Sequence, residues 1–83
     1  MKGRSIYHSE IPLPEAEPGA SVRITRIEGG RRLCARLAHM GIYPGTIMEV
    51  ISSGRGAPCI VRVRNATISL GRGMSRKIIV YKL

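Results

Sequence analysis

The sequence predicts a mainly β fold: a small barrel of about five strands, with one short α-helix inserted after the first strand. Three observations lead to this fold class. Short β-branched runs separated by turn residues fill most of the chain, and one segment, Arg31–Met40, has helical periodicity. The 83 residues suffice for one small core. Closing a sheet into a barrel removes exposed strand edges economically in so short a chain.

The N-terminal segment is interrupted by prolines. Pro12, Pro14 and Pro18 rule out a regular helix there, because proline lacks the backbone N–H that a helix interior needs. We therefore expect residues 1–18 to form an extended arm and residues 19–83 to form the barrel domain. No apolar stretch follows the first basic residues, so we expect no secretory signal and a cytoplasmic location.

The first predicted strand is followed by the only predicted long helix. Residues 22–27 are β-branched and alternate between apolar and polar positions until the alternation slips at the end, which indicates a bulge or the end of the strand. In the predicted helix, residues 31–40, the apolar Leu33, Leu37 and Met40 recur at the spacing of one helix face.

The end of this helix and the next turn have clear local signals. Gly41 can adopt the left-handed conformation of a helix C-terminus, which places Ile42 against Leu37 as in a Schellman motif. The segment Tyr43–Thr46 has Pro and Gly at its two central positions, the arrangement that a type II turn requires.

The rest of the chain predicts short strands joined by tight turns. The remaining predicted strands cover residues 47–51, 59–64, 68–70 and 78–83. Residues 52–58, rich in Gly, predict a hairpin loop, and Asn65 tolerates the positive φ of a tight turn. Residues 71–77 predict a connector with one helical turn around Met74. We expect the first and last strands of the domain to pair.

The charge balance is strongly basic. The chain has 14 Lys and Arg against 5 acidic residues, a net charge of +9, and beyond residue 20 the only acids are Glu28 and Glu49. Such a surface favours an anionic partner, which leaves nucleic acid, an acidic protein face or an anionic membrane surface open. The shortage of carboxylates, with neither histidine in a recognisable nucleophile motif, argues against an enzyme. We therefore expect neither catalytic residues nor a cofactor.

The candidate metal ligands do not form a site in the sequence. Cys34 and His39 are five positions apart on the predicted helix, which does not put two ligands on one face. Cys59 alternates with valines and is predicted to be a reduced core residue, while His8 and Glu10 fall in the arm. We expect no dedicated metal site.

One segment resembles a known family signature. Residues 37–45, Leu-Ala-His-Met-Gly-Ile-Tyr-Pro-Gly, resemble the pattern L-x-x-[LM]-G-[IL]-x-P-G of the ferrous iron transport protein A family, FeoA. Further pieces of the chain resemble the same family in the same order: Val22-x-Ile24-x-x-Ile27 with Gly29, Pro58 before Cys59–Val63, Ile68-x-Leu70-Gly71-Arg72-Gly73-Met74, and Ile78-x-Val80. The resemblance covers roughly residues 17–83.

The resemblance implies both a fold and a role. It implies an SH3-like five-stranded barrel, in agreement with the fold class that the residues themselves predict. It also implies a small cytosolic accessory protein that binds the cytoplasmic part of FeoB, the membrane ferrous-iron transporter, and modulates uptake without chemistry of its own. The basic surface would also suit peripheral contact with an anionic membrane leaflet beside such a partner.

Candidate contact residues lie on the helix, the corner after it and the long hairpin loop. The candidate partner-binding residues are Arg32, Arg36, Met40, Ile42, Tyr43 and Arg55. Arg32 and Arg36 share one helix face with His39, and the alternative for that face is a merely solvated charge stripe. Tyr43 is a large amphipathic side chain at a turn position that the cap chemistry does not require, which favours a contact role.

The competing function is nucleic-acid binding. Small basic β-barrels often bind DNA or RNA. The chain has no Phe or Trp and three Tyr, so platforms for base stacking are scarce. A non-specific binder that contacts only phosphates stays open as the alternative, and its affinity should fall steeply with salt.

Overall fold

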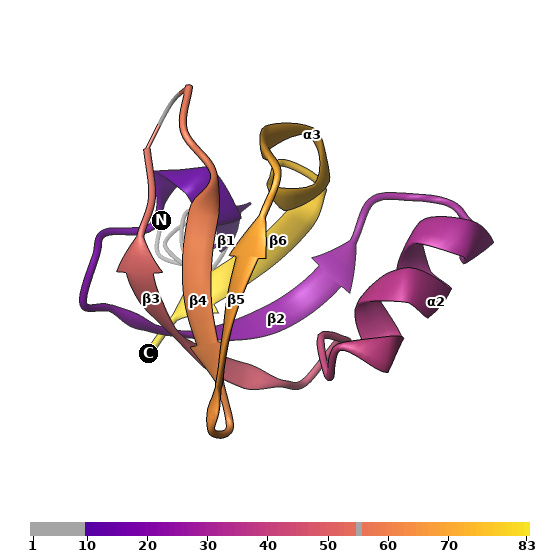
Figure 1. Cartoon of the computed structure of the whole chain (residues 1–83), viewed down its shortest axis with the longest axis horizontal. Helices are drawn as coiled ribbons and strands as arrows, with labels where there is room; N and C mark the ends of the chain where they lie inside the picture. Colours follow the sequence, from indigo (N-terminus) through magenta and orange to yellow (C-terminus); the bar gives the residue numbers. More distant parts are fainter. Residues whose placement is uncertain (1–9, 55) are drawn as a thin grey trace, which may run out of the picture.

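The computed structural model describes residues 10–54 and 56–83, which form six antiparallel strands and three short helical segments. In chain order they are β1 (Glu10–Pro12), the 3-10 helix η1 (Leu13–Glu15), β2 (Ser21–Ile27), α2 (Arg31–His39), β3 (Ile47–Ser52), β4 (Cys59–Val63), β5 (Ala66–Leu70), α3 (Arg72–Ser75) and β6 (Ile78–Lys82). The strands form one curled sheet in the order β1-β6-β2-β3-β4-β5, and α2 stands beside it (Figure 1). The predicted mainly β barrel with one inserted helix is confirmed.

The N-terminal segment differs from the expected arm. β1 pairs antiparallel with β6, with Ile11 opposite Val80, and the side chain of Leu13 is fully buried in the core. Pro12 fits because it ends a strand at the edge of the sheet, where no partner needs its N–H. The prolines exclude a regular helix but not a strand, so the described part of residues 1–18 belongs to the barrel. Residues 1–9 lie outside the described residues.

The core follows the alternation that the sequence predicts for the central strands. In β4 the side chains of Cys59, Val61 and Val63 are buried while Arg62 between them is exposed. The first and last long strands, β2 and β6, pair as expected, and a register shift in β2 lies between Ile24 and Arg26, slightly before the expected slip. The buried side chains form one cluster, of Leu13, Ala16, Val22, Ile24, Leu37, Ile42, Met48, Val50, Cys59, Val61, Val63, Leu70, Ile78 and Val80.

The end of α2 is the predicted Schellman motif. The backbone N–H of Ile42 donates to the carbonyl of Leu37 at 2.9 Å, and that of Gly41 donates to Ala38 at 2.9 Å. Gly41 has a φ of +84°, a conformation in which a Cβ would clash with the backbone. Leu37 is the one fully buried residue of α2. The helix is therefore anchored at its C-terminal end, the half-buried Leu33 and Met40 pack against the core, and its arginines face solvent.

The turn after the helix is also as predicted, and it is tied to the sheet. The N–H of Thr46 donates to the carbonyl of Tyr43 at 3.0 Å, and Gly45 has a φ of +97° at the third turn position. Gly45 and Thr46 also exchange backbone hydrogen bonds with Ile24 of β2, at 2.7 and 2.9 Å. The helix, the turn and β2 thus form one rigid corner.

The β4–β5 hairpin is tighter than predicted, because β4 ends at Val63 and β5 already begins at Ala66 instead of residue 68. Val63 pairs with Ala66, so Arg64 and Asn65 form a two-residue loop. The positive φ, +59°, falls on Arg64 and not on Asn65. The turns that two-residue hairpin loops favour, types I′ and II′, both have a positive φ at their first position, so the twist of the strands outweighs the preference of the side chains. Holding a non-glycine residue there costs about 1–3 kcal/mol.

Candidate interaction surface

The C-terminal end of α2, the turn after it and the β4–β5 hairpin meet at one corner of the barrel. They enclose a shallow open hollow of about 590 Å³. Its lining residues are Ala38, His39, Met40, Gly41, Tyr43, Val63, Arg64, Asn65 and Ala66. We call this surface the corner site. Its glycine cap and turn hold the backbone rigidly, so its side chains project from fixed positions.

Two side chains from distant parts of the sequence meet in the corner site. The Nη2 of Arg64 donates a hydrogen bond to the hydroxyl of Tyr43 at 3.3 Å, and Tyr43 keeps 42% of its surface exposed. An arginine carries five donors, and no other described residue accepts a hydrogen bond from this guanidinium, so its remaining N–H groups can meet an incoming acceptor. Met40 and His39 border the same hollow, half-buried and exposed respectively.

The structure describes all but one of the sequence-predicted contact residues, and these lie in the corner site, on the exposed face of α2 or in the core. Met40 and Tyr43 lie in the corner site, and Arg32 and Arg36 are exposed on α2, where His39 shares their face. Arg55 lies outside the described residues.

The expectation that Ile42 contacts a partner is wrong. Its side chain is fully buried, and it belongs to the core cluster together with Leu37. The physical reason is the Schellman cap itself. The residue after the left-handed glycine turns back over the last helical turn, where it shields the apolar stripe from water. The Schellman motif that the sequence predicted therefore buries the side chain of Ile42.

Arg64 is the residue of the site that sequence reasoning missed. It is 21 positions from Tyr43, and only the hairpin brings the two together. The available signal was the pattern Val-Arg-Asn-Ala, which is compatible with a two-residue hairpin loop. That pattern does not say which loop residue has the positive φ or where its side chain points.

Among residues 10–54 and 56–83, the ion pairs lie away from the corner site. The described ion pairs lie on the sheet: Arg26 contacts Glu10 at 2.7 Å and Glu28 at 3.0 Å, and Arg62 contacts Glu49 at 3.3 Å. Hydrogen bonding to Glu28, and next to Glu10, raises the pKa of Arg26 above its ordinary value.

The arginines of α2 and the corner lack such partners. Within residues 10–54 and 56–83, no ion pair involves Arg32, Arg36 or Arg64. The corner site and the adjoining helix face therefore present positive charge that is free to meet an acidic surface.

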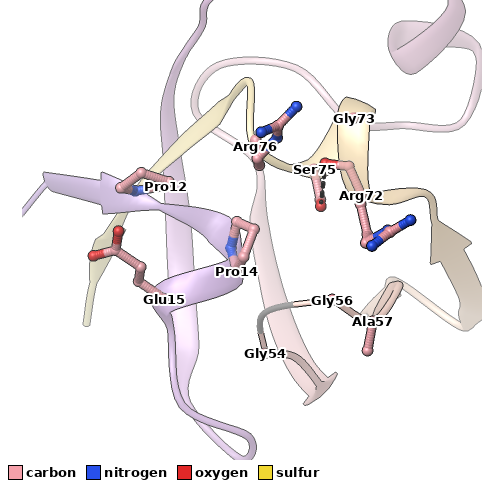
Figure 2. Close-up of a pocket in the computed structure, with 10 residues that line it drawn as sticks. All are labelled: Pro12, Pro14, Glu15, Gly54, Gly56, Ala57, Arg72, Gly73, Ser75 and Arg76. Atoms are coloured by element: carbon pink, nitrogen blue, oxygen red, sulfur yellow. Dashed lines mark hydrogen bonds between the residues drawn. The ribbon is translucent and has the colours of Figure 1, made fainter.

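A second hollow, of about 710 Å³, opens at the other end of β4 and β5. It is bounded by the prolines of β1 and η1, the β3–β4 loop and α3, and Arg72, Arg76 and Glu15 supply its charged groups. Figure 2 shows the side chain of Arg72 directed toward Ala57 of the loop, while that of Arg76 points away from it. The hydroxyl of Ser75 donates to the carbonyl of Arg72 at 3.2 Å and fixes the short helix.

The two cysteines of the chain lie in different surroundings. Cys59 is fully buried, and Cys34 is half-buried with its Sγ 3.8 Å from the carbonyl of Gly29. In the part of the chain that the structure describes, no three His, Cys, Asp or Glu side chains gather to hold a metal ion. None of the described helices is both long enough and apolar enough to cross a bilayer.

Fold and site together define a class of protein. It is a small β-barrel with one projecting helix, and the exposed polar groups of the barrel lie on turns at a rigid corner. The chain belongs to the FeoA family, because the model of the FeoA domain matches residues 11–82. The resemblance carried by residues 37–45 is thereby confirmed.

Comparison with individual proteins agrees with this family. The chain is 36% identical over 69 residues to a protein of Methanocaldococcus jannaschii named putative Fe(2+) transport protein A, and the match covers 83% of each chain. A crystal structure titled Iron Uptake Regulatory Protein (FeoA) superposes with a TM-score of 0.82 at 31% identity, over 89% of this chain and 99% of the other.

Two further solved structures extend the likeness. A FeoA-like protein from Clostridium acetobutylicum has a TM-score of 0.73 at 26% identity, over 90% of this chain and 88% of its own. The IdeR protein of T. acidophilum has a TM-score of 0.80 at 21% identity, over 90% of this chain and 35% of its own. At that identity the second match shows the shared fold alone. The SH3-like barrel is thus common to proteins of different lengths.

Proposed function

We propose that this protein is an accessory of ferrous-iron transport that docks on the cytoplasmic part of a FeoB-type membrane transporter. Membership of the FeoA family and the name of the M. jannaschii relative support the link to iron transport. The observation that carries the docking role is the corner site, where an exposed tyrosine and an arginine without an acidic partner are held together on a rigid backbone.

The corner site has the chemistry of a protein-binding surface. Tyrosine and arginine are enriched among the residues that dominate interface energies, and methionine adapts its shape to a partner. Arg64 would pair with a carboxylate of the partner while Tyr43 packs against its surface. Arg32 and Arg36 on the adjoining helix face would speed the encounter with an acidic surface through long-range attraction.

Docking would act on the transporter through differential affinity. A partner that binds one conformational or nucleotide state more tightly shifts the population toward that state, and no chemistry by the barrel is required. In this role the chain works on the cytoplasmic side of the membrane, where its basic surface would also be attracted to anionic lipids.

The test is binding of the full chain to the isolated cytoplasmic domain of a FeoB-type transporter, measured by calorimetry at low and near-physiological salt. We expect binding that survives physiological salt and that random duplex DNA does not displace. Tyr43→Ala and Arg64→Asn should each weaken it about tenfold, since both belong to the corner site. Lys82→Gln, a charge-matched change at the exposed end of β6, should leave it unchanged.

The competing function predicts a different pattern. If the chain binds duplex DNA with a steep dependence on salt and does not bind the transporter domain, the basic surface serves nucleic acid and the proposal is overturned. If the transporter domain binds all three variants as well as it binds the natural chain, docking uses another face than the corner site.

A further inference from the structure

The strand β5 leaves an open edge on the sheet. It lies at the end of the strand order, and no described segment pairs with its outer side. The opposite edge strand, β1, has three residues and ends in Pro12, two features that discourage pairing. In contrast, β5 pairs with β4 over five residues without a bulge and contains neither a charged residue nor a proline. It lacks the usual protection against an added strand.

The hairpin fixes which backbone groups of β5 face outward. In a two-residue hairpin the closing pair, Val63 and Ala66, exchanges hydrogen bonds, and bonded pairs then alternate along the ladder. Ala66, Ile68 and Leu70 therefore bond to β4. Thr67 and Ser69 direct their N–H and C=O groups away from β4, toward the open edge. Two donors and two acceptors thus stand in one row.

Positive charge flanks this row at both ends. β5 runs from the β4–β5 hairpin to α3, and so connects the corner site with the second hollow (Figure 1). Arg64 lies before the strand and Arg72 lies after it, both exposed. Neither forms an ion pair with any of the described residues. The edge therefore combines backbone groups that no described residue pairs with and two separated cations.

We propose that the edge of β5 accepts an extended strand from an acidic partner, with one carboxylate near each end of that strand pairing with Arg64 and with Arg72. Backbone hydrogen bonds to Thr67 and Ser69 supply affinity, and the two arginines select for acidic ends. This strand site rests on the proposed function and deepens it, because it names the kind of segment that the transporter would contribute.

Charge favours this occupant over a second copy of the chain. If two β5 edges paired antiparallel, Arg64 of one copy would approach Arg72 of the other, and like charges repel. The net charge of +9 on each chain adds a general repulsion between copies. An acidic strand removes both penalties.

The first test uses a blocked peptide, Glu-Thr-Val-Thr-Val-Thr-Glu, and follows amide hydrogen exchange of the full chain by NMR. We expect the amides of Thr67 and Ser69 to exchange about tenfold more slowly with the peptide, because each acquires an acceptor. A peptide with Lys in place of both Glu should give no such protection. An added strand pairs with β5 through every second amide, so two peptides are compared, each N-methylated on one of the two sets of alternate amides. The peptide methylated on the amides that pair with β5 should bind more weakly than the other.

The second test removes one outward N–H of the protein. Ser69→Pro deletes that donor without touching the ladder to β4, and Ser69→Ala keeps the backbone intact as the matched control. We expect Ser69→Pro to weaken peptide binding about tenfold and Ser69→Ala to leave it within about twofold. The methylated peptides act on the natural chain, so they decide the matter even if Ser69→Pro fails to fold.

Several results would overturn the strand site. Peptide binding without protection of Thr67 and Ser69, or equal binding of the Glu and Lys peptides, excludes it. Protection that grows with protein concentration in the absence of peptide assigns the edge to a second copy instead. If the transporter domain binds Ser69→Pro and Ser69→Ala equally, the strand site is excluded and the proposed function stands. If the acidic peptide binds as expected and the transporter domain does not, the proposed function fails and the strand site stands.

Discussion

The guanidinium of Arg64 donates a hydrogen bond to the hydroxyl of Tyr43 at 3.3 Å, joining the hairpin between β4 and β5 to the turn after α2. The residue that reaches across has a strained backbone, with a φ of +59°. Strain at a non-glycine residue persists only where the surrounding structure imposes it, and it is often found at functional positions. The corner site is therefore the part of the barrel where stability and binding should respond differently to substitution.

Replacing Arg64 by glycine should separate these two properties. Arg64→Gly relieves the strain of the positive φ, so we expect the free energy of unfolding in urea to rise or stay level despite the lost side chain. Affinity for the transporter domain should fall about tenfold, since the guanidinium is lost. Asn65→Gly is the control, because its φ is not positive and glycine there adds only chain entropy. If Arg64→Gly lowers the free energy of unfolding markedly and Asn65→Gly does not, the backbone at Arg64 is not strained.

Adjacent residues 42 and 43 should have opposite effects. Ile42→Val removes one buried methylene and should lower the free energy of unfolding by about 1 kcal/mol without changing partner affinity. Tyr43→Ala removes an exposed ring and should leave stability nearly unchanged while it weakens binding. Urea denaturation and calorimetry on both variants check this. If the folded Ile42→Val variant binds the partner more weakly, Ile42 does take part in the interface.

The helix cap should be sensitive to a single methyl group. Gly41→Ala places a Cβ 3.6 Å from Cγ1 of Val63, an ordinary contact, so the cost comes from the φ of +84° and should be about 1–2 kcal/mol. Gly73→Ala in α3 is the control, since its added Cβ meets no atom and its φ is not positive. It should stabilise the protein or leave it unchanged. Equal losses in both variants would mean that the cap is not the cause.

The ion pairs of Arg26 should support the docking of β1. Arg26→Gln removes the contacts to Glu10 and Glu28, and we expect faster amide exchange in β1 with a difference that fades as salt is added. The folded-state pKa of Arg26 is raised, so its contribution is present at all physiological pH values and is lost only as the pH rises through that pKa in strongly alkaline solution. A loss of this contribution between pH 6 and 8 would point to another group.

The exposed basic face of α2 should control how fast the protein associates with its partner. Arg32→Glu and Arg36→Glu reverse two charges without touching the core, so stability should be retained. We expect slower association with the transporter domain and a weaker dependence of the rate on salt, as measured by stopped-flow fluorescence. Unchanged association and salt dependence in both variants would show that the face is merely solvated. Lys82→Glu, which changes the net charge by the same two units at the exposed end of β6, provides the charge control.

The elements that the sequence predicted well are those that form from neighbouring residues. Each of these elements depends on residues within a few positions of one another. They are the cap at Gly41, the turn at Pro44 and Gly45, and the alternation in β4. Their outcomes, a Schellman cap, a type II turn and a strand with one buried face, need no knowledge of the rest of the chain. The family signature of residues 37–45 coincides with this locally determined corner.

The tertiary structure decided the features that depend on contacts between distant segments. β1 is a strand because β6, from the far end of the chain, offers it an edge, and the burial of Leu13 adds apolar stabilisation. Arg64 has the positive φ because the twist of β4 and β5 requires it at that loop position, and its contact with Tyr43 then follows. Local residue preferences are worth a few tenths of a kcal/mol to about 1 kcal/mol, and strand pairing and core burial outweigh them.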